Sequence, residues 1–325
     1  MNIFAAMLRG FVLLAILLPF QFAFAQSPRF PEKTVRILVG YAPGGLPDTV
    51  ARVVSQKMAE RWGQQAVIEN RAGANSGLAA ELVANAAPDG YTLLVTDNST
   101  HAINPFLYRK LPYDPAKLLP ISLVARAPLY LAAHSSFPAN TLGEAIALLK
   151  ANPGKFTFGS SGVGSTHHLC MEFFRAALGL DMAHVPYKGT GQSVPAVIAG
   201  QVPLVWSAYP SLAGSAKDGR IKLLAVNSLG RSSSAPNLPA VAEIIPGFDF
   251  APTIGYFAPV GTPRELIARL SADATEAARS PEVTAKLAGL DIQTVGGTPE
   301  EYAASLKSDE GRYAKAVKIS GATAD

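Results

Sequence analysis

The stretch that decides the fold lies at residues 35–48 and reads VRILVGYAPGGLPD. Its first part, Val35–Tyr41, is an apolar run typical of a strand buried in a parallel sheet. Two glycines then permit a sharp turn. Pro47 and Asp48 suit the first turn of a helix, where proline leaves no N–H unpaired and a carboxylate faces the positive helix end. This order predicts a strand–loop–helix unit whose loop can accept a ligand.

The same order recurs along the chain and predicts two α/β domains. Further strands are predicted at Ala66–Glu69, Thr92–Thr96, Phe156–Phe158, His184–Tyr187, Val202–Ser207, Ile221–Val226 and Thr253–Ala258, and helices at Asp48–Trp62, Leu78–Asn85, Ser193–Ala199, Arg264–Arg279, Pro281–Leu287 and Pro299–Lys318, with one more ending near Leu178. The apolar stretch Ile121–Ala133 predicts a strand that runs from one domain into the other, with a return near Phe250–Tyr256. We expect one domain of residues 26–126 plus 250–325 and a second of residues 127–249. A single doubly wound sheet is the alternative.

The N-terminus predicts an exported protein. Arg9 precedes the apolar run Phe11–Phe20, and Ala23–Ala25 gives a small-x-small cleavage signal. We therefore expect residues 1–25 to be a signal peptide cleaved after Ala25 and the mature chain to be periplasmic. An uncleaved anchor is the alternative.

Composition excludes several classes of protein. The chain has 325 residues, of which 49% are hydrophobic and 16% charged, so it is not a disordered protein. The net charge of +4 is small and its basic residues are scattered, which argues against a nucleic-acid partner. The single cysteine, Cys170, stands between Leu169 and Met171 and is expected to be a buried apolar residue.

Three glycine-rich loops each follow a predicted strand and open a helix. They span residues 41–48, 159–166 and 187–193. Free backbone N–H groups and the helix dipole make such helix starts suitable for anions, carboxylates included. Three of them in one chain favour a binding site over simple turns.

Signatures of enzymes and metal sites are largely missing from the sequence. No Walker motif occurs, and Gly159–Gly162 lacks the Gly-x-Ser-x-Gly spacing of a nucleophile elbow. His168 and Glu172 could share a helix face, but no third metal ligand is indicated. We expect no catalytic residue, no cofactor and no metal. An exported α/β hydrolase using a loop serine, with His101 or His168 as base, is the alternative.

Several motifs, in this order, resemble one known family. They are Pro31-Glu32-Lys33, Tyr41-Ala42-Pro43-Gly44-Gly45 with Asp48, Ala51 and Arg52, Glu69-Asn70-Arg71-Ala72-Gly73-Ala74, Pro88-Asp89-Gly90-Tyr91-Thr92-Leu93-Leu94, His101-Ala102-Ile103-Asn104-Pro105, Gly159-Ser160-Ser161-Gly162-Val163-Gly164-Ser165 with His168-Leu169, and Val185-Pro186-Tyr187-Lys188-Gly189. Over Phe30–Val317 the chain resembles the extracytoplasmic solute receptors of tripartite tricarboxylate transporters, also called the Bug family.

The resemblance implies a two-domain periplasmic binding protein, type II-like, in which each domain is a mixed sheet flanked by helices and two crossovers join them. It implies a receptor, expected to be a monomer, that captures a small organic carboxylate and delivers it to a membrane permease. A ligand-sensing partner of a signalling receptor is an alternative use of the same fold. The implied ligand-binding residues are Tyr41, Gly44, Gly45, Asp48, Asn98, Ser99, Thr100, Ser160, Ser161, Ser165, Thr166, Tyr187, Thr190 and Tyr209; Lys188 stays ambiguous.

Two departures from the family pattern bear on the solute. Leu46-Pro47 replaces a small polar pair, and Pro203 stands where an aspartate is common. The first offers apolar surface, and the second removes a group that could pair with an ammonium. They predict a carboxylate or dicarboxylate with an apolar or aromatic body rather than an amino acid or a small polyhydroxy acid. The alternative is that Leu46 packs against the neighbouring helix and Pro203 starts a strand.

Overall fold

The computed structural model describes residues 30–324, and the predicted signal peptide and its cleavage site lie outside them. The description below concerns the compact unit that begins at Lys33. None of the described helices is long and apolar enough to span a bilayer.

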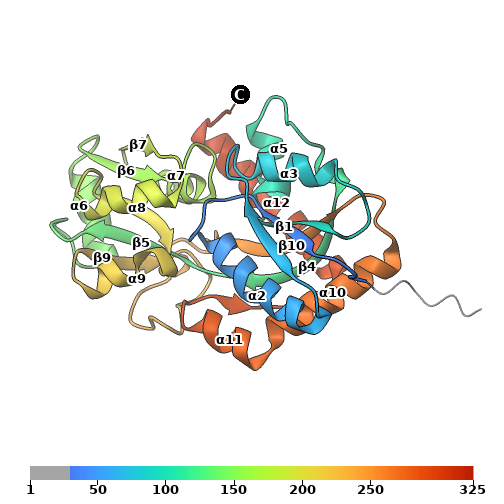
Figure 1. The fold of residues 1–325 in the computed structure, drawn as a ribbon. Helices are drawn as coiled ribbons and strands as arrows, with labels where there is room; N and C mark the ends of the chain where they lie inside the picture. Colours follow the sequence, from blue (N-terminus) through green and yellow to red (C-terminus); the bar gives the residue numbers. More distant parts are fainter. Residues whose placement is uncertain (1–29, 325) are drawn as a thin grey trace, which may run out of the picture. The chain divides into compact units, whose positions relative to one another are not determined.

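A six-stranded mixed sheet forms the first half of the architecture (Figure 1). Its strands, in spatial order, are β11 (Gln293–Thr294), β4 (Leu118–Arg126), β10 (Thr253–Pro259), β3 (Thr92–Asp97), β1 (Val35–Val39) and β2 (Ala66–Asn70). Strand β1 pairs in parallel with β2 and β3, whereas β10 runs antiparallel to both β3 and β4. The parallel strands therefore end on one edge, where their following loops gather.

A five-stranded mixed sheet forms the second half. Its strands, in spatial order, are β7 (Met182–Pro186), β6 (Phe156–Ser160), β8 (Leu204–Ala208), β5 (Leu129–His134) and β9 (Ile221–Val226). Strand β6 is parallel to β7 and β8, and β5 is antiparallel to β8 and β9.

Helices follow most of the parallel strands. They are α2 (Leu46–Trp62), α3 (Gly77–Ala84), α4 (Ser99–Ala102), α5 (Asn104–Leu107), α6 (Leu142–Ala151), α7 (Thr166–Leu178), α8 (Thr190–Ile198), α9 (Tyr209–Lys217), α10 (Arg264–Arg279), α11 (Pro281–Ala288) and α12 (Pro299–Ser320), with short 3₁₀ turns at Pro115–Lys117 and Val241–Glu243.

Helix α2 shows how local sequence sets these boundaries. Pro47 lies in its first turn and Gly63 ends it in the left-handed conformation, with φ 63°. Between them Val50, Val54 and Met58 recur at helical spacing and are buried. The apolar stripe holds the helix against its sheet, and each such side chain contributes roughly 1.5–3 kcal/mol by leaving water.

Two crossovers join the sheets. Strand β4 continues through Ala127 and Pro128 into β5, and the return segment leads from β9 to β10. Buried Asn227 links the two passages: Leu129 N donates to its Oδ1 at 2.7 Å, and its own N donates to Leu129 O at 3.0 Å. The backbone N of Phe250 donates to Asn227 O at 3.0 Å, so one residue connects both crossovers.

The prediction of a two-domain α/β fold with mixed sheets is confirmed, and the alternative of one doubly wound sheet is wrong. The proposed boundaries at residues 126/127 and 249/250 stay a prediction. The stretch Ile121–Ala133 forms two strands, because Pro128 lacks the N–H that a continuous ladder needs. Cys170 is buried, as expected.

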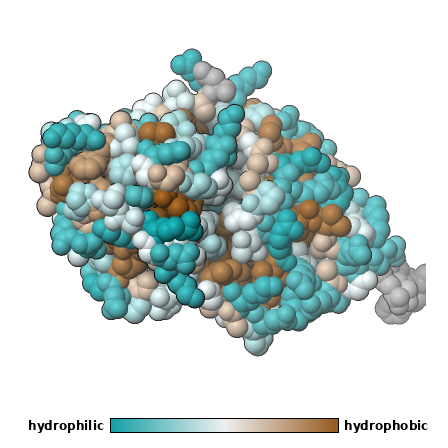
Figure 2. Space-filling view, turned by 60° about the vertical axis from the view of Figure 1, so that its left-hand side comes forward, coloured by the Kyte–Doolittle hydropathy of each residue, from teal (hydrophilic) through white to brown (hydrophobic). Residues whose placement is uncertain are grey.

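The surface carries no continuous apolar band on the face in Figure 2, where hydrophilic residues are interspersed with hydrophobic ones. Single exposed apolar residues are ordinary on a protein surface and need no partner to explain them.

Candidate functional site

A cavity of about 500 Å³ lies among the loops at the carboxyl ends of strands from both sheets. The six-stranded sheet contributes the loops after β1, β2 and β3, and the five-stranded sheet contributes those after β6, β7 and β8. Its lining residues are Gly40–Pro43, Gly45–Pro47, Ala72–Ser76, Asp97, Tyr108, Leu129, Ser161–Val163, Ser165–His167, Lys188–Gly191, Ser207, Ala208, Ser211 and Pro252.

Four helix N-termini reach this cavity. Helices α2, α7 and α8 begin at lining residues, α9 begins directly after the lining residue Ala208, and three of the four have no side-chain cap. The first N–H groups of an α-helix have no partner within the helix, and their dipoles add to a partial positive charge. The cavity therefore favours an anion.

The loop after β1 is fixed from outside the cavity. Gly44 has φ +80°, a conformation that glycine adopts without strain, and its N donates to Asp48 Oδ2 at 2.9 Å. Asp48 also accepts from Arg52 and Asn70. Although burial opposes its charged form, these hydrogen bonds hold the pKa of Asp48 below its usual value. Asp48 thus shapes the loop rather than facing a solute.

The Gly/Ser loop before α7 is held by hydroxyls and histidines. Ser165 caps the helix by accepting from His168 N at 3.2 Å and donates to Gly162 O at 2.8 Å. The rings of His168 and His184 stack with centroids 3.9 Å apart, and His184 Nε2 lies 2.6 Å from Ser160 Oγ. These contacts set the position of the α7 N-terminus.

Two buried hydroxyls at the cavity have no hydrogen-bond partner among the described residues. They are Thr166 Oγ1, at the first position of α7, and Ser207 Oγ, near the start of α9. Thr166 is 2% exposed and Ser207 0% exposed. A buried polar group without a partner costs about 1–3 kcal/mol, so both hydroxyls are suited to a polar solute.

Six of the fourteen predicted binding residues line this cavity. They are Tyr41, Gly45, Ser161, Ser165, Thr166 and Thr190. They come from both sheets, as expected for a solute held between two domains.

The other eight lie outside the cavity lining, mostly because other contacts occupy their side chains. Asn98 donates to Asp309, Ser99 to Asp97, Ser160 pairs with His184, and Thr100 Oγ1 lies 3.0 Å from His101 Nδ1. Tyr209 packs on Tyr130, the ring of Tyr187 lies beside Gly159, Asp48 binds the loop at Gly44, and Gly44 itself is exposed.

Sequence reasoning missed several polar lining residues, among them Asn75, Asp97, His167 and Ser207. Asn75 lies in a run of three non-glycine residues with positive φ, which propensity does not reveal. Strand β1 approaches this run so closely that a Cβ at Gly40 would lie 1.6 Å from Ser76 Oγ. Asp97 is the last residue of β3 and Ser207 the second-to-last residue of β8, and the local sequence does not show that these strand ends meet.

The two departures from the family pattern differ in their position relative to the cavity. Leu46 and Pro47 line the cavity, as the apolar-body hypothesis requires. Pro203 does not: it precedes β8, whereas the cavity lies at the other end of that strand, around Ser207. The argument from Pro203 against an ammonium group is therefore wrong.

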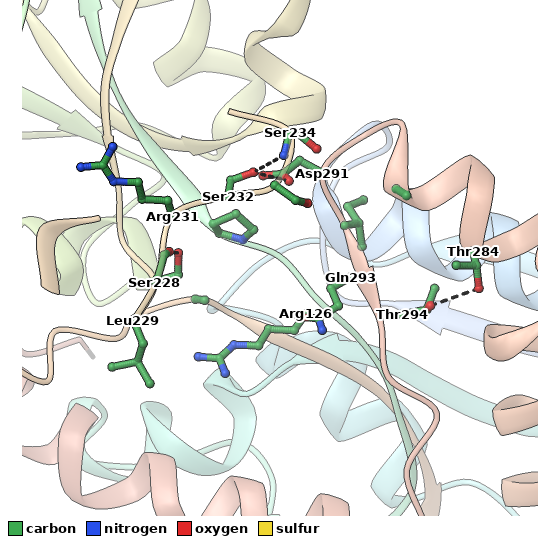
Figure 3. A pocket seen from close by; sticks show the side chains of 16 residues that line it. Arg126, Ser228, Leu229, Arg231, Ser232, Ser234, Thr284, Asp291, Gln293 and Thr294 are labelled. Carbon is green, nitrogen blue, oxygen red and sulfur yellow. Dashed lines mark hydrogen bonds between the residues drawn. The ribbon is translucent and has the colours of Figure 1, made fainter. Parts of the chain in front are cut away.

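A second cavity of about 620 Å³ lies beside the crossovers (Figure 3). Its charged side chains already have partners: Arg126 with Asp249, and Arg231 with Glu243. In Figure 3 Ser232 points toward Asp291, and its Oγ donates to Asp291 Oδ1 at 2.6 Å. No unpartnered buried hydroxyl lines it within residues 30–324, so it is the weaker candidate.

The expected hydrolase pairing of a loop serine with His101 or His168 does not form within residues 30–324, although Ser160 and Ser161 lie within hydrogen-bond distance of His184 and His167. The His101 ring stacks on Phe257, and His168 Nδ1 accepts from Gly164 N at 3.1 Å. Neither ring is hydrogen-bonded to a serine of the glycine-rich loops. Within residues 30–324 no group of three or more His, Cys, Asp or Glu side chains could hold a metal ion.

Comparison with known proteins finds similar chains and similar solved structures. A protein from Pseudomonas sp. strain P51, described as the UPF0065 protein in the tcbD-tcbE intergenic region, is 35% identical over 292 residues, 89% of this chain and 86% of the relative. R. palustris Rpa4515, solved with adipate, superposes with a TM-score of 0.86 at 31% identity, covering 90% of this chain and 98% of that one. MatC from Rhodopseudomonas palustris, solved with bound malate, gives 0.81 at 32% identity, with 89% and 100% covered.

The model of one family matches most of the chain. It is described as the tripartite tricarboxylate transporter family receptor and matches residues 50–320. The matched region includes strands of both sheets and all the cavity-lining segments except the loop after β1, which precedes residue 50. By this match, and by its relatives, the chain belongs to the family of tripartite tricarboxylate transporter receptors.

Proposed function

We propose that the solute is an organic carboxylate whose anionic group binds at the N-termini of α7 and α9. The observation that carries this is the pair of unpartnered, buried hydroxyls, Thr166 Oγ1 and Ser207 Oγ, which line one cavity beside two helix starts. Each hydroxyl can donate to one carboxylate oxygen, and nearby N–H groups add further donors. The relatives solved with adipate and malate support the same solute class.

The charge of the cavity supports an anion as well. Lys188 is exposed at the cavity, and no ion pair engages its Nζ among the described residues. Burial lowers the pKa of His167 to about 4, so this ring is neutral near pH 7. Among the described residues, the charged side chains that line the cavity are therefore Lys188, after β7 of the five-stranded sheet, and Asp97, at the end of β3 of the six-stranded sheet.

The body of the solute is proposed to be apolar. Pro43, Leu46, Pro47, Leu129 and Pro252 line the cavity, and apolar area buried there contributes roughly 25 cal/mol per Å². A carboxylate with an aliphatic or aromatic body suits this lining.

Members of this family are substrate-binding receptors and not enzymes, and they are periplasmic. We propose further that the signal peptide is cleaved after Ala25, that the mature chain is a monomer divided at the predicted boundaries, and that it passes the solute to a membrane permease. The family match supports the transport role; a signalling role would use the same site.

A thermal-shift screen of the mature chain tests the proposed anchor. Wild-type protein is heated with aliphatic and aromatic carboxylates, and the stabilising acids are repeated on Thr166→Val and Ser207→Ala. Both substitutions are expected to reduce the shift, since each removes a donor worth about tenfold in affinity. Ser233→Ala, in the second cavity, should respond like wild type. Unchanged shifts in both cavity variants would contradict the anchor.

A further inference from the structure

Asp97 offers the solute cavity an oxygen that the protein does not use. It is the last residue of β3, lines the cavity, and is 8% exposed. Its Oδ1 accepts three hydrogen bonds: from Tyr41 OH at 2.8 Å, from Ser99 N at 3.0 Å and from Ser99 Oγ at 2.5 Å. Among the described residues, no hydrogen bond from another residue ends on Oδ2.

This carboxylate also has no cationic partner. The ion pairs of the described chain do not include Asp97, and the other charged side chain of the lining, Lys188, belongs to the opposite sheet's loops. A buried carboxylate oxygen that lacks a donor is unfavourable, and burial raises the pKa of Asp97 although the hydrogen bonds from Ser99 and Tyr41 oppose this. A donor brought by the solute would satisfy Oδ2.

The orientation of the solute follows from charge. If the solute's carboxylate binds at α7 and α9, as proposed above, it stays away from Asp97, because two carboxylates in one low-dielectric cavity repel. The opposite end of the solute then meets Asp97. Pro203, which the sequence offered as a reason against an ammonium there, is not at the cavity.

We propose that the solute carries a hydrogen-bond donor, a hydroxyl or an ammonium, at the end away from its carboxylate, and that Asp97 Oδ2 accepts it. The inference rests on the proposed carboxylate anchor and adds the second recognition group. It makes Asp97 a specificity-determining residue: acids with a distal donor are selected over acids with a purely apolar end or a second carboxylate.

Matched acids test this by titration calorimetry at pH 7.5. The probes are hexanoate, 6-hydroxyhexanoate, 6-methoxyhexanoate, 6-aminohexanoate and adipate, together with benzoate, 4-hydroxybenzoate and 4-methoxybenzoate. In at least one of the two series, the hydroxy or amino acid should bind about tenfold or more tightly than the ether, because only the ether cannot donate. Adipate should bind more weakly than 6-hydroxyhexanoate. Comparison of 6-hydroxyhexanoate with 6-aminohexanoate shows whether a hydroxyl or an ammonium is the preferred donor.

The same titrations on Asp97→Asn identify the acceptor. This substitution keeps an oxygen for Tyr41 and Ser99 but replaces the second oxygen by an N–H donor. The preference for the distal donor should disappear, and the ether should gain relative to the hydroxy acid. Asp218→Asn is the control, since Asp218 is an exposed aspartate outside the cavity, and it should keep the wild-type order.

The outcomes separate the two proposals. If the parent acids bind but donors bring no gain in either series, or adipate binds most tightly, the role of Asp97 is overturned and the carboxylate anchor stands. A donor preference that survives in Asp97→Asn also overturns it. If no acid binds at all, both proposals fail. The comparison of hydroxy acid with ether uses wild-type protein alone, so it decides even when the variant does not fold.

Discussion

At the scale of single residues, the adjacent glycines Gly44 and Gly45 differ in backbone conformation. Gly44 has φ +80°, whereas Gly45 has φ −73° and ψ 168°, which any residue adopts. Gly44→Ala should therefore lower the free energy of unfolding by about 1 kcal/mol through left-handed strain. Gly45→Ala should change it little, because its Cβ would lie at an ordinary 3.4 Å from Ala42 O.

Urea unfolding of the two variants beside wild type measures this difference. The pair is well matched, since both substitutions add one methyl group to neighbouring positions of the same loop. Equal losses of unfolding free energy would show that the left-handed conformation of Gly44 is not what the loop requires.

Individual site residues could be predicted where they belong to a recognisable loop motif. Gly45, Ser161, Ser165 and Thr166 follow from glycine-rich segments that open helices. Asp97 and Ser207 could not be predicted in this way, since they lie at the ends of strands, and a residue there belongs to the site only when neighbouring strands bring their ends together. That adjacency is a property of sheet order and is not written in local sequence.

At the scale of elements, the histidines around the α7 N-terminus couple its stability to pH. Burial lowers the pKa of His168 to about 3 and that of His184 to about 4, with the charges of Arg175 and, for His168, of His184 adding to the effect. In the unfolded chain such groups titrate near pH 6.5. Between these values the unfolded state binds more protons, so the free energy of unfolding falls as pH drops from about 7 toward 4.

Thermal unfolding from pH 8 to pH 4 checks this direction. His184→Gln removes one of the two stacked rings and should make the decline in melting temperature with falling pH shallower. His134→Gln, a change in β5 outside this cluster, should leave the decline as in wild type. The same slope in His184→Gln and wild type would exclude the stacked pair as its source.

The bounds of helices and strands were predicted well where apolar residues recur regularly along the sequence. The helix at Arg264–Arg279 and the strand at Ile221–Val226 have the predicted bounds. Helix α6 was missed although Thr141 caps it by accepting from Glu144 N, a start signal present in the sequence. Helix α9 was missed because Tyr209 and Pro210 follow the strand without an intervening loop.

At the scale of the whole molecule, two crossovers between two sheets predict a hinge. A solute held by loops of both sheets contacts both domains at once and so favours the closed form. One contact between the two halves is made by Asn75 Nδ2, which donates to Gly164 O at 3.5 Å. Small-angle scattering with a saturating acid should give a smaller radius of gyration than without it. An unchanged radius would indicate a rigid, preformed pocket.

We expect the cavity between the two sheets to recognise a carboxylate through helix N-termini and two buried hydroxyls. The most direct measurement is titration calorimetry of the mature protein with its tightest-binding acid and with the uncharged amide of the same acid. We expect saturable binding of one acid per chain and binding of the amide at least about tenfold weaker, because the donors of the site face a negative charge. An amide that binds as tightly as the acid, or a carboxylate panel with no saturable binding, would contradict it.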